Sequence, residues 1–300
     1  MLKPNKDLAI KAAINLTPQY ADLLRDLQRG NGRAFFSAEI ANIRKKLGDY
    51  VLVYDDERKI GRALFLAMMG EDGFKEFTAE INNTTPSEQQ EFVDGVASPD
   101  NEFVKAFSSF EIPKTPSEWK AAREANAQLP EDERKELEKR GAILWCFLFS
   151  SFFNVLALMV HGSRMTTLVP QAIAGDDEAF LKAIQIDRML FTHYPYFRDR
   201  KFTAQDEGDV AFLEQLAYRE TNPPLRGKVT YPALYMLFGI LDSFQILSDL
   251  KHREILDICD EAGLDRYQNR IEDVGYLTKR LGDYRDWQKF NGMSMHLNLT

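Results

Sequence analysis

A run of 19 residues from Ala142 to Val160 contains no charged side chain, glycine or proline. Such a run is about long enough to cross a bilayer, and it is also typical of a helix buried in the core of a large helical protein. Ser150, Ser151 and Asn154 lie in its middle, and aromatic belts do not flank it at both ends. We therefore favour a buried core helix at residues 142–160, with a single membrane span as the alternative.

A second apolar run, residues 229–247, contains one charged residue, Asp242. Two helices of this kind would bury each other. Around them, helical spacing of apolar residues and start signals such as Thr-Pro-Ser-Glu predict further helices. We expect these at residues 7–15, 18–29, 33–46, 74–81, 86–96, 116–128, 130–160, 174–188, 207–219, 251–262 and 273–290.

The pattern predicts a mainly α-helical, multi-helical globular protein around the central apolar helix. Residues 50–54 are the best strand candidate, so we allow at most one short β-hairpin near residues 50–65. The charged stretch 114–140 reads as a helical connector. We place a domain boundary near Arg140, which separates an N-terminal helical region (1–140) from a C-terminal helical domain (141–300).

Two stretches of the sequence share the same short motifs. Gly175-Asp176 and Gly208-Asp209 are 33 residues apart, and each is followed by Ala-Phe-Leu after two residues or one residue, respectively. A period near 33 is found in helical-hairpin repeats, but such arrays need at least three units. A recurring helix-capping signal is the alternative explanation.

The composition limits the class of protein. The formal charge is −8, and residues 1–140 (21 basic, 25 acidic) and 141–300 (17 basic, 21 acidic) each carry −4. This charge disfavours non-specific binding to DNA or anionic membranes. The two cysteines, Cys146 and Cys259, indicate neither a disulfide framework nor a zinc site, and no secretory signal is evident. We expect a cytoplasmic protein.

Catalytic motifs are absent from the sequence: the four histidines have no metal-binding spacing, and no nucleophile elbow, phosphate loop or dinucleotide fingerprint occurs. We therefore expect no cofactor and no metal. The best catalytic candidates are the polar residues near the end of the central helix, where a pocket would form. These are His161, Arg164, Asp187 and His193.

The C-terminal helix pair is a weaker candidate for nucleic-acid binding. Its two helices, 251–262 and 273–290, have the outline of a helix-turn-helix, although the nine-residue connection Leu264–Glu272 is longer than usual. The basic residues that would contact phosphates are Arg266, Arg270, Lys279, Arg280 and Arg285. Residues 265–289 carry six basic and five acidic side chains, a net charge of only +1.

From these observations we favour a non-enzymatic helical binding or scaffold protein. A protein is the expected partner, nucleic acid is a second option through the C-terminal helices, and a membrane is the least favoured. The alternatives are an enzyme with a polar pocket near His161 and Arg164, or a membrane-associated protein with a single span.

Overall fold

The structure is a computed structural model of the chain. It describes residues 6–29, 54, 70, 72–80, 82–88, 91, 116–222, 231–264 and 274–289, and the structural statements below concern these residues. Within them the chain is mainly α-helical and forms no strand, which confirms the predicted fold class. The predicted hairpin near residues 50–65 lies outside the described residues, apart from Tyr54.

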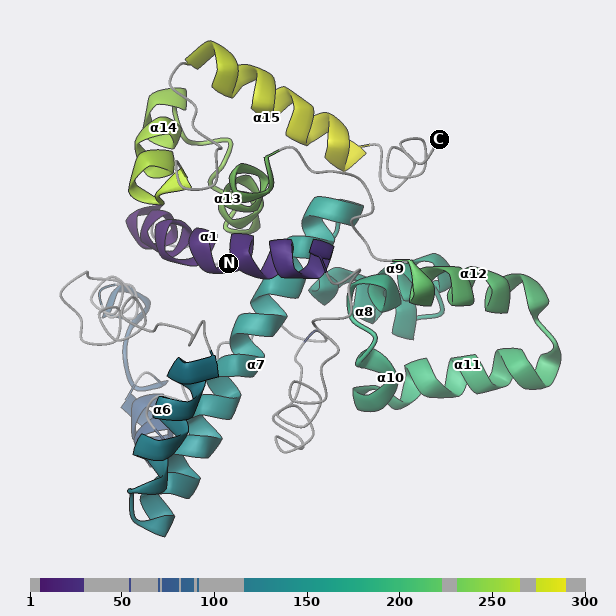
Figure 1. Cartoon of the computed structure of the whole chain (residues 1–300), viewed down its shortest axis with the longest axis horizontal. Helices are drawn as coiled ribbons and strands as arrows, with labels where there is room; N and C mark the ends of the chain where they lie inside the picture. Colours follow the sequence, from purple (N-terminus) through teal and green to yellow (C-terminus); the bar gives the residue numbers. More distant parts are fainter. Residues whose placement is uncertain are drawn as a thin grey trace.

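The helices are arranged around one long central helix (Figure 1). They are α1 (Lys6–Arg29), α6 (Pro116–Ala127), α7 (Glu131–His161), α8 (Met165–Ile173), α9 (Asp177–Ile186), α10 (Leu190–His193), α11 (Pro195–Glu207), α12 (Val210–Thr221), α13 (Pro232–Ser243), α14 (His252–Glu261) and α15 (Val274–Lys289). Figure 1 shows α1, α13, α14 and α15 gathered on one side of the C-terminal end of α7, and α8 to α12 on the other. The N-terminal end of α7 lies beside α6.

Helix α7 contains the predicted core helix. No side chain between residues 148 and 161 is exposed, and Phe152, Leu156 and Met159 are fully buried. Helices α8, α9, α13 and α15 pack against α7, and Tyr20 of α1 meets Phe152 edge-on, with 5.4 Å between ring centroids. The helix continues without a break through Arg140, so the predicted domain boundary falls inside it.

The polar side chain in the middle of this apolar helix has a defined role. Asn154 Oδ1 accepts a hydrogen bond of 3.1 Å from the backbone N–H of Thr166, in the first turn of α8. The first N–H groups of a helix have no partner inside the helix, so Asn154 supplies one from a neighbouring helix. Among the described residues, no helix combines the length and the apolar character needed to cross a membrane.

The second apolar run forms α13, and it packs directly on α7, as predicted. The two helices meet at Gly239. A Cβ atom at this position would lie 2.9 Å from Met159 Cγ and 2.9 Å from Val155 Cγ1, closer than side chains normally approach. Gly239 is therefore required for the close approach of α13 to α7.

The predicted helix break at Thr17-Pro18 is wrong, because α1 continues through Pro18. A proline inside a helix removes one backbone hydrogen bond and costs about 3 kcal/mol. Two features offset that cost: the buried hydroxyl of Thr17 donates to the Ala13 carbonyl at 2.6 Å, and α1 packs its apolar face on α13. Each large side chain buried this way contributes about 1.5–3 kcal/mol, and α1 buries Leu16, Tyr20 and Leu24.

Helix α15 also packs on α13. Leu277, Leu281 and Tyr284 recur at helical spacing and are buried, and the Tyr284 ring lies 5.6 Å from that of Tyr235 and 5.5 Å from that of Phe238. This seam fixes which face of α15 points to solvent.

The remaining helices form a unit that we call the hairpin lobe (residues 165–221). Helices α8 and α9 form one hairpin and α11 and α12 a second, and α12 packs on α9. Each hairpin turns at a glycine with positive φ, Gly175 (+101°) and Gly208 (+70°). The aspartate that follows caps the next helix: Asp176 accepts from the Ala179 N–H at 3.0 Å, and Asp209 from the Phe212 N–H at 3.2 Å.

Candidate functional site

The four candidate pocket residues come from the end of α7, the start of α8, the end of α9 and the end of α10. His161 is the last residue of α7 and is only 3% exposed. Burial, followed by the positive charges of Arg219 and Lys182, lowers the pKa of its imidazole to about 3. A general acid or base works best with a pKa near the working pH. His161 is therefore neutral near pH 7 and poorly suited to proton transfer there.

Arg164 lies three residues after His161, at the N-cap position of α8. Its guanidinium donates a hydrogen bond to the backbone carbonyl of Ser243, at the C-terminal end of α13. The carbonyl groups in the last turn of a helix carry partial negative charge, which a cation stabilises. Arg164 thus connects the beginning of α8 with the end of α13.

The prediction that Asp187 lies within a helix is wrong. Helix α9 ends at Ile186, and Asp187 follows it in extended conformation. Its Oδ1 accepts from the N–H of Met189 at 3.0 Å, a local bond that competes with continuation of the helix. Asp187 is fully buried.

Asp187 belongs to a buried contact that the sequence did not suggest. The hydroxyl of Tyr54 donates to Asp187 Oδ2 at 3.1 Å, and the backbone N–H of Tyr54 donates to the Tyr194 hydroxyl, also at 3.1 Å. Tyr54 has no exposed surface. It joins Asp187 to Tyr194, the neighbour of the half-buried candidate His193. We expected a strand at this tyrosine, and nothing local signals a partner 133 residues away.

The five candidate residues for nucleic-acid binding differ in their surroundings. Arg266 and Arg270 lie outside the described residues. Arg280 is mostly buried, pairs with Asp283 at 2.8 Å, and lies over the ring of Tyr231 at 4.4 Å. Lys279 and Arg285 are exposed on α15, but six positions of a helix separate them by about 120° around its axis.

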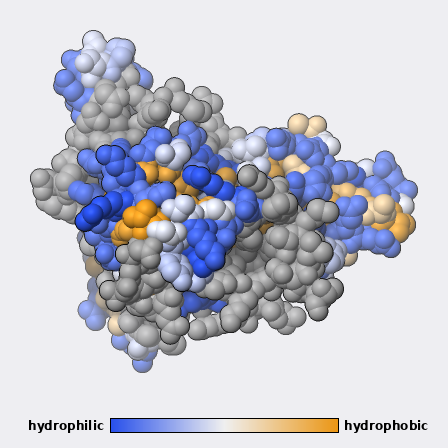
Figure 2. Space-filling view, turned by 90° about the horizontal axis from the view of Figure 1, so that it is seen from above, coloured by the Kyte–Doolittle hydropathy of each residue, from blue (hydrophilic) through white to orange (hydrophobic). Residues whose placement is uncertain are grey.

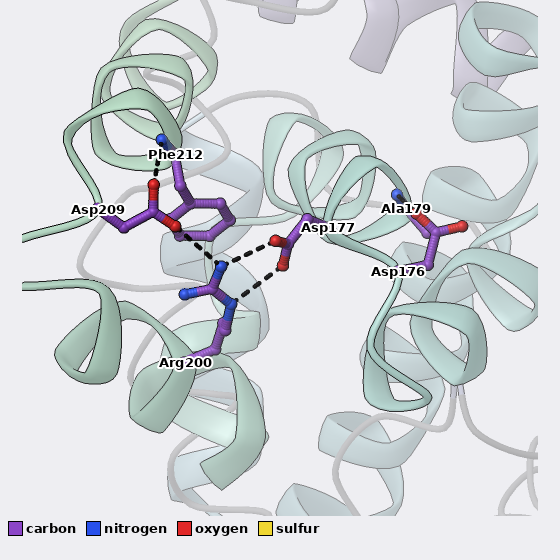
Figure 3. Close-up of polar contacts among 6 residues, drawn as sticks. All are labelled: Asp176, Asp177, Ala179, Arg200, Asp209 and Phe212. Carbon is purple, nitrogen blue, oxygen red and sulfur yellow. Dashed lines mark hydrogen bonds and ion pairs between the residues drawn. The ribbon is translucent and has the colours of Figure 1, made fainter. Parts of the chain in front are cut away.

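The densest polar cluster of the hairpin lobe surrounds Arg200 of α11, and we call it the arginine clasp (Figure 3). The Arg200 guanidinium binds both carboxylate oxygens of Asp177, at 3.0 and 2.8 Å, and one oxygen of Asp209, at 3.4 Å. It also lies over the Phe212 ring, 4.0 Å from the centroid. Hydrogen bonds to Asp177, ahead of the cost of burial, raise the pKa of Arg200, so it stays charged.

The clasp holds two helix beginnings together. Asp177 lies in the first turn of α9, and Asp209 is the cap of α12. Both aspartates face the positive end of a helix dipole, and Arg200 balances their charge. Beneath the clasp, the Phe180 ring stacks on Phe197 at 4.6 Å and lies 5.4 Å from Phe212.

Two further basic side chains of the lobe also connect neighbouring helices. Lys201 pairs with Glu220 at 2.9 Å and lies 4.8 Å above the Phe191 ring. Arg219 donates to Gln185 at 2.7 Å and reaches Glu178 at 3.4 Å. The sequence indicated both Gly-Asp caps, but not the three basic residues that connect the helices.

Within the described part of the chain, no three His, Cys, Asp or Glu side chains come together in a way that would hold a metal ion. Cys259 is a buried free thiol whose pKa is raised to about 12, first by burial and then by Asp260. Comparison with protein-family models, with curated proteins and with solved structures gave no match.

Proposed function

We propose that the chain is a non-enzymatic helical binding protein and that the hairpin lobe is its recognition surface for a protein partner. The main support is the distribution of exposed apolar side chains. Among the described residues, the large hydrophobic side chains that are exposed lie in two places, and most of them belong to the lobe. These are Ile173, Phe202, Val210 and Tyr218 in the lobe, and Val274 and Tyr276 on α15.

The shape of the lobe also supports this function. In Figure 1 the α11–α12 hairpin projects away from the rest of the helices, and in Figure 2 apolar residues lie among hydrophilic ones at that end of the molecule. Protein interfaces commonly place apolar and aromatic anchors inside a polar rim. The arginine clasp and the packed rings around Phe180 stabilise the lobe from inside. Its outer surface is not needed for this packing and can serve binding.

The polar residues near the end of α7 support binding rather than catalysis. Arg164 stabilises a helix end, Asp187 accepts bonds from Tyr54 and Met189, and His161 is neutral near pH 7. A catalytic set needs groups that converge on one reacting atom with suitable pKa values. The contacts of Arg164 and Asp187 and the low pKa of His161 therefore favour a role in stabilising the fold.

Contact with nucleic acid through α15 is a second candidate, supported by the exposed Lys279 and Arg285. We propose the cytoplasm as the site of action, where a buried free thiol such as Cys259 stays reduced.

Site-specific photo-crosslinking in the cells that naturally produce the protein tests the proposal. A photoreactive phenylalanine analogue replaces Val210 in the lobe or, as the control, Tyr276 on α15. These two positions are similarly exposed, at 62% and 59%. We expect a discrete protein adduct from position 210 that is absent from position 276. Equal adducts from both positions, or none from position 210, would contradict the proposal.

A further inference from the structure

The outward face of α11 carries three exposed side chains that do not take part in the packing of the lobe. Asp199, Phe202 and Asp206 occur at positions i, i+3 and i+7, which lie on one side of a helix. All three are exposed, and Phe202 is 56% exposed. The opposite side of α11 supplies the buried Phe197 and Ala204. An aromatic ring flanked by two carboxylates therefore points to solvent.

The same combination of groups occurs inside the protein with a cation bound to it. Arg200 lies over Phe212 between Asp177 and Asp209. Lys201 lies over Phe191 and pairs with Glu220, and Arg280 lies over Tyr231 and pairs with Asp283, as the distances above show. A positive charge is attracted by the face of an aromatic ring, and a neighbouring carboxylate strengthens its binding.

The basic residues of the α11–α12 hairpin all pair with carboxylates, three of them inside the lobe. Arg200, Lys201 and Arg219 bind carboxylates inside the lobe, and Arg198 pairs with its neighbour Asp199 at 3.2 Å. Asp206 forms no ion pair with any residue that the structure describes. The hairpin carries six acidic and four basic residues between positions 195 and 221, so the excess charge is negative.

The position of Asp206 adds to this imbalance. Asp206 and Glu207 lie in the last turn of α11, and no basic residue shares that turn. A carboxylate at the C-terminal end of a helix is repelled by the partial negative charge of the last carbonyl groups. A cation bound beside Asp206 would relieve that repulsion.

We propose that the outward face of α11 binds a cationic segment of the protein partner, with one arginine or lysine side chain over Phe202 and between Asp199 and Asp206. This inference rests on the proposed function, and it specifies the chemistry of the partner. The excess negative charge and the exposed ring together favour a basic peptide over an acidic or purely apolar one.

A fluorescein-labelled oligoarginine peptide serves as the probe, and its binding to the full chain is followed by fluorescence anisotropy at low salt. Phe202→Leu keeps an apolar side chain but removes the ring, and Asp206→Asn removes one charge. We expect each substitution to weaken binding about fivefold, the size of a modest cation–π or charge contribution. Arg198→Ala removes a competing cation from the same face and should strengthen binding.

Two matched controls separate this site from general attraction to an acidic protein. Asp257→Asn removes the same charge from exposed α14, and Tyr276→Leu removes an exposed ring from α15. Both should bind the peptide like the wild type. A proton NMR spectrum should show the methylene groups of a bound arginine shifted upfield by the Phe202 ring, and Phe202→Leu should abolish the shift.

Equal weakening by the control substitutions, or no weakening by Phe202→Leu and Asp206→Asn, would overturn the inference. The two proposals fail separately. A crosslink from position 210 that persists when the peptide test fails would leave the lobe as a binding surface for a partner of different chemistry. Loss of the crosslink together with specific peptide binding would instead remove the proposed function.

Discussion

At the scale of single residues, one pair of buried polar groups joins distant parts of the chain. Tyr54 and Asp187 are both fully buried and are joined by one hydrogen bond across 133 positions. A buried acceptor that loses its donor costs more than the bond itself contributes, since water cannot replace the donor. Stability therefore depends strongly on such single contacts.

We expect Tyr54→Phe to lower the free energy of unfolding by about 1–3 kcal/mol, because Asp187 Oδ2 loses its phenol donor while the ring remains. Urea denaturation followed by circular dichroism measures the change. Tyr276→Phe, at an exposed position, is the control and should have little effect. If both variants lose the same small amount, the Tyr54–Asp187 bond does not contribute to stability.

His161 should make stability depend on pH. The folded pKa of about 3 lies below the ordinary value of 6.5, so the unfolded chain binds more protons between these two values. The free energy of unfolding therefore rises with pH through this window and falls as acid is added. The contribution of one such group is about 1.4 kcal/mol per pH unit.

Urea denaturation of the wild type and of His161→Gln between pH 6.5 and pH 4 measures this contribution. All other ionisable groups are common to the two proteins, so their effects cancel in the difference. We expect a slope that is smaller in the variant by up to about 1.4 kcal/mol per pH unit. Parallel curves would show that the imidazole is not shielded from water in the folded state.

At the scale of helices, close approach and capping decide how the elements pack. Gly239 lets α13 approach α7, whereas a Cβ atom at Gly282 of α15 would have nothing within 4 Å. The two glycines thus form a matched pair. Both lie in helices, where replacement by alanine raises helix propensity by about 1 kcal/mol.

We expect Gly239→Ala to lower stability by about 1–3 kcal/mol, because overpacking against Val155 and Met159 outweighs the gain in propensity. Gly282→Ala should raise stability by up to about 1 kcal/mol. Thermal and urea unfolding of both variants measure these changes. An increase in stability for both would mean that α13 and α7 can move apart without cost.

The arginine clasp should act as one unit. Arg200→Lys keeps the charge but removes the forked guanidinium that binds Asp177 through two bonds. We expect Arg200→Ala to cost about 1–3 kcal/mol and Arg200→Lys to recover only part of it. Arg198→Ala, at an exposed neighbouring pair, is the control. Full recovery by lysine would show that charge alone matters.

The sequence predicted those elements whose signals are local. Helices α7 and α13 follow from apolar residues on all sides, and the caps at Asp176 and Asp209 follow from short Gly-Asp motifs. The continuation of α1 through Pro18 was not predictable, since it depends on burial against α13. Local propensity favoured a break there, and tertiary packing outweighed it.

The candidate site was less predictable than the fold. Arg200 lies 23 positions from Asp177 and nine from Asp209, on a helix with a strongly polar sequence, so no spacing rule connects them. The role of Phe202 likewise depends on which side of α11 packs inward. Asp187 was chosen from the sequence as a candidate residue, but its partner Tyr54 could be found only from the fold.

At the scale of the whole molecule, the charge of −8 opposes approach to nucleic acid. Among the candidates that the structure describes, Lys279 and Arg285 are exposed, whereas Arg280 is held by Asp283 and Tyr231. We expect weak, salt-sensitive binding in gel shifts that Lys279→Ala/Arg285→Ala abolishes. Arg280→Ala should instead lower stability while leaving binding nearly unchanged.

Gel shifts at rising salt with these two variants therefore separate a phosphate-binding role from a structural one. Loss of binding in Arg280→Ala, with its stability intact, would contradict the assignment. Complete absence of binding in the wild type would leave α15 as a covering helix for α13.

Helix α7 has a mechanical consequence for the molecule. Its 31 residues make a rod of about 46 Å at about 1.5 Å per residue. The C-terminal end is fixed by α8, α9, α13 and α15, while the N-terminal end lies beside α6, away from those helices (Figure 1). A tilt of about 10° at the fixed end would therefore move the far end by about 8 Å. A rod of this length would convert a small tilt in the core into a much larger displacement at α6.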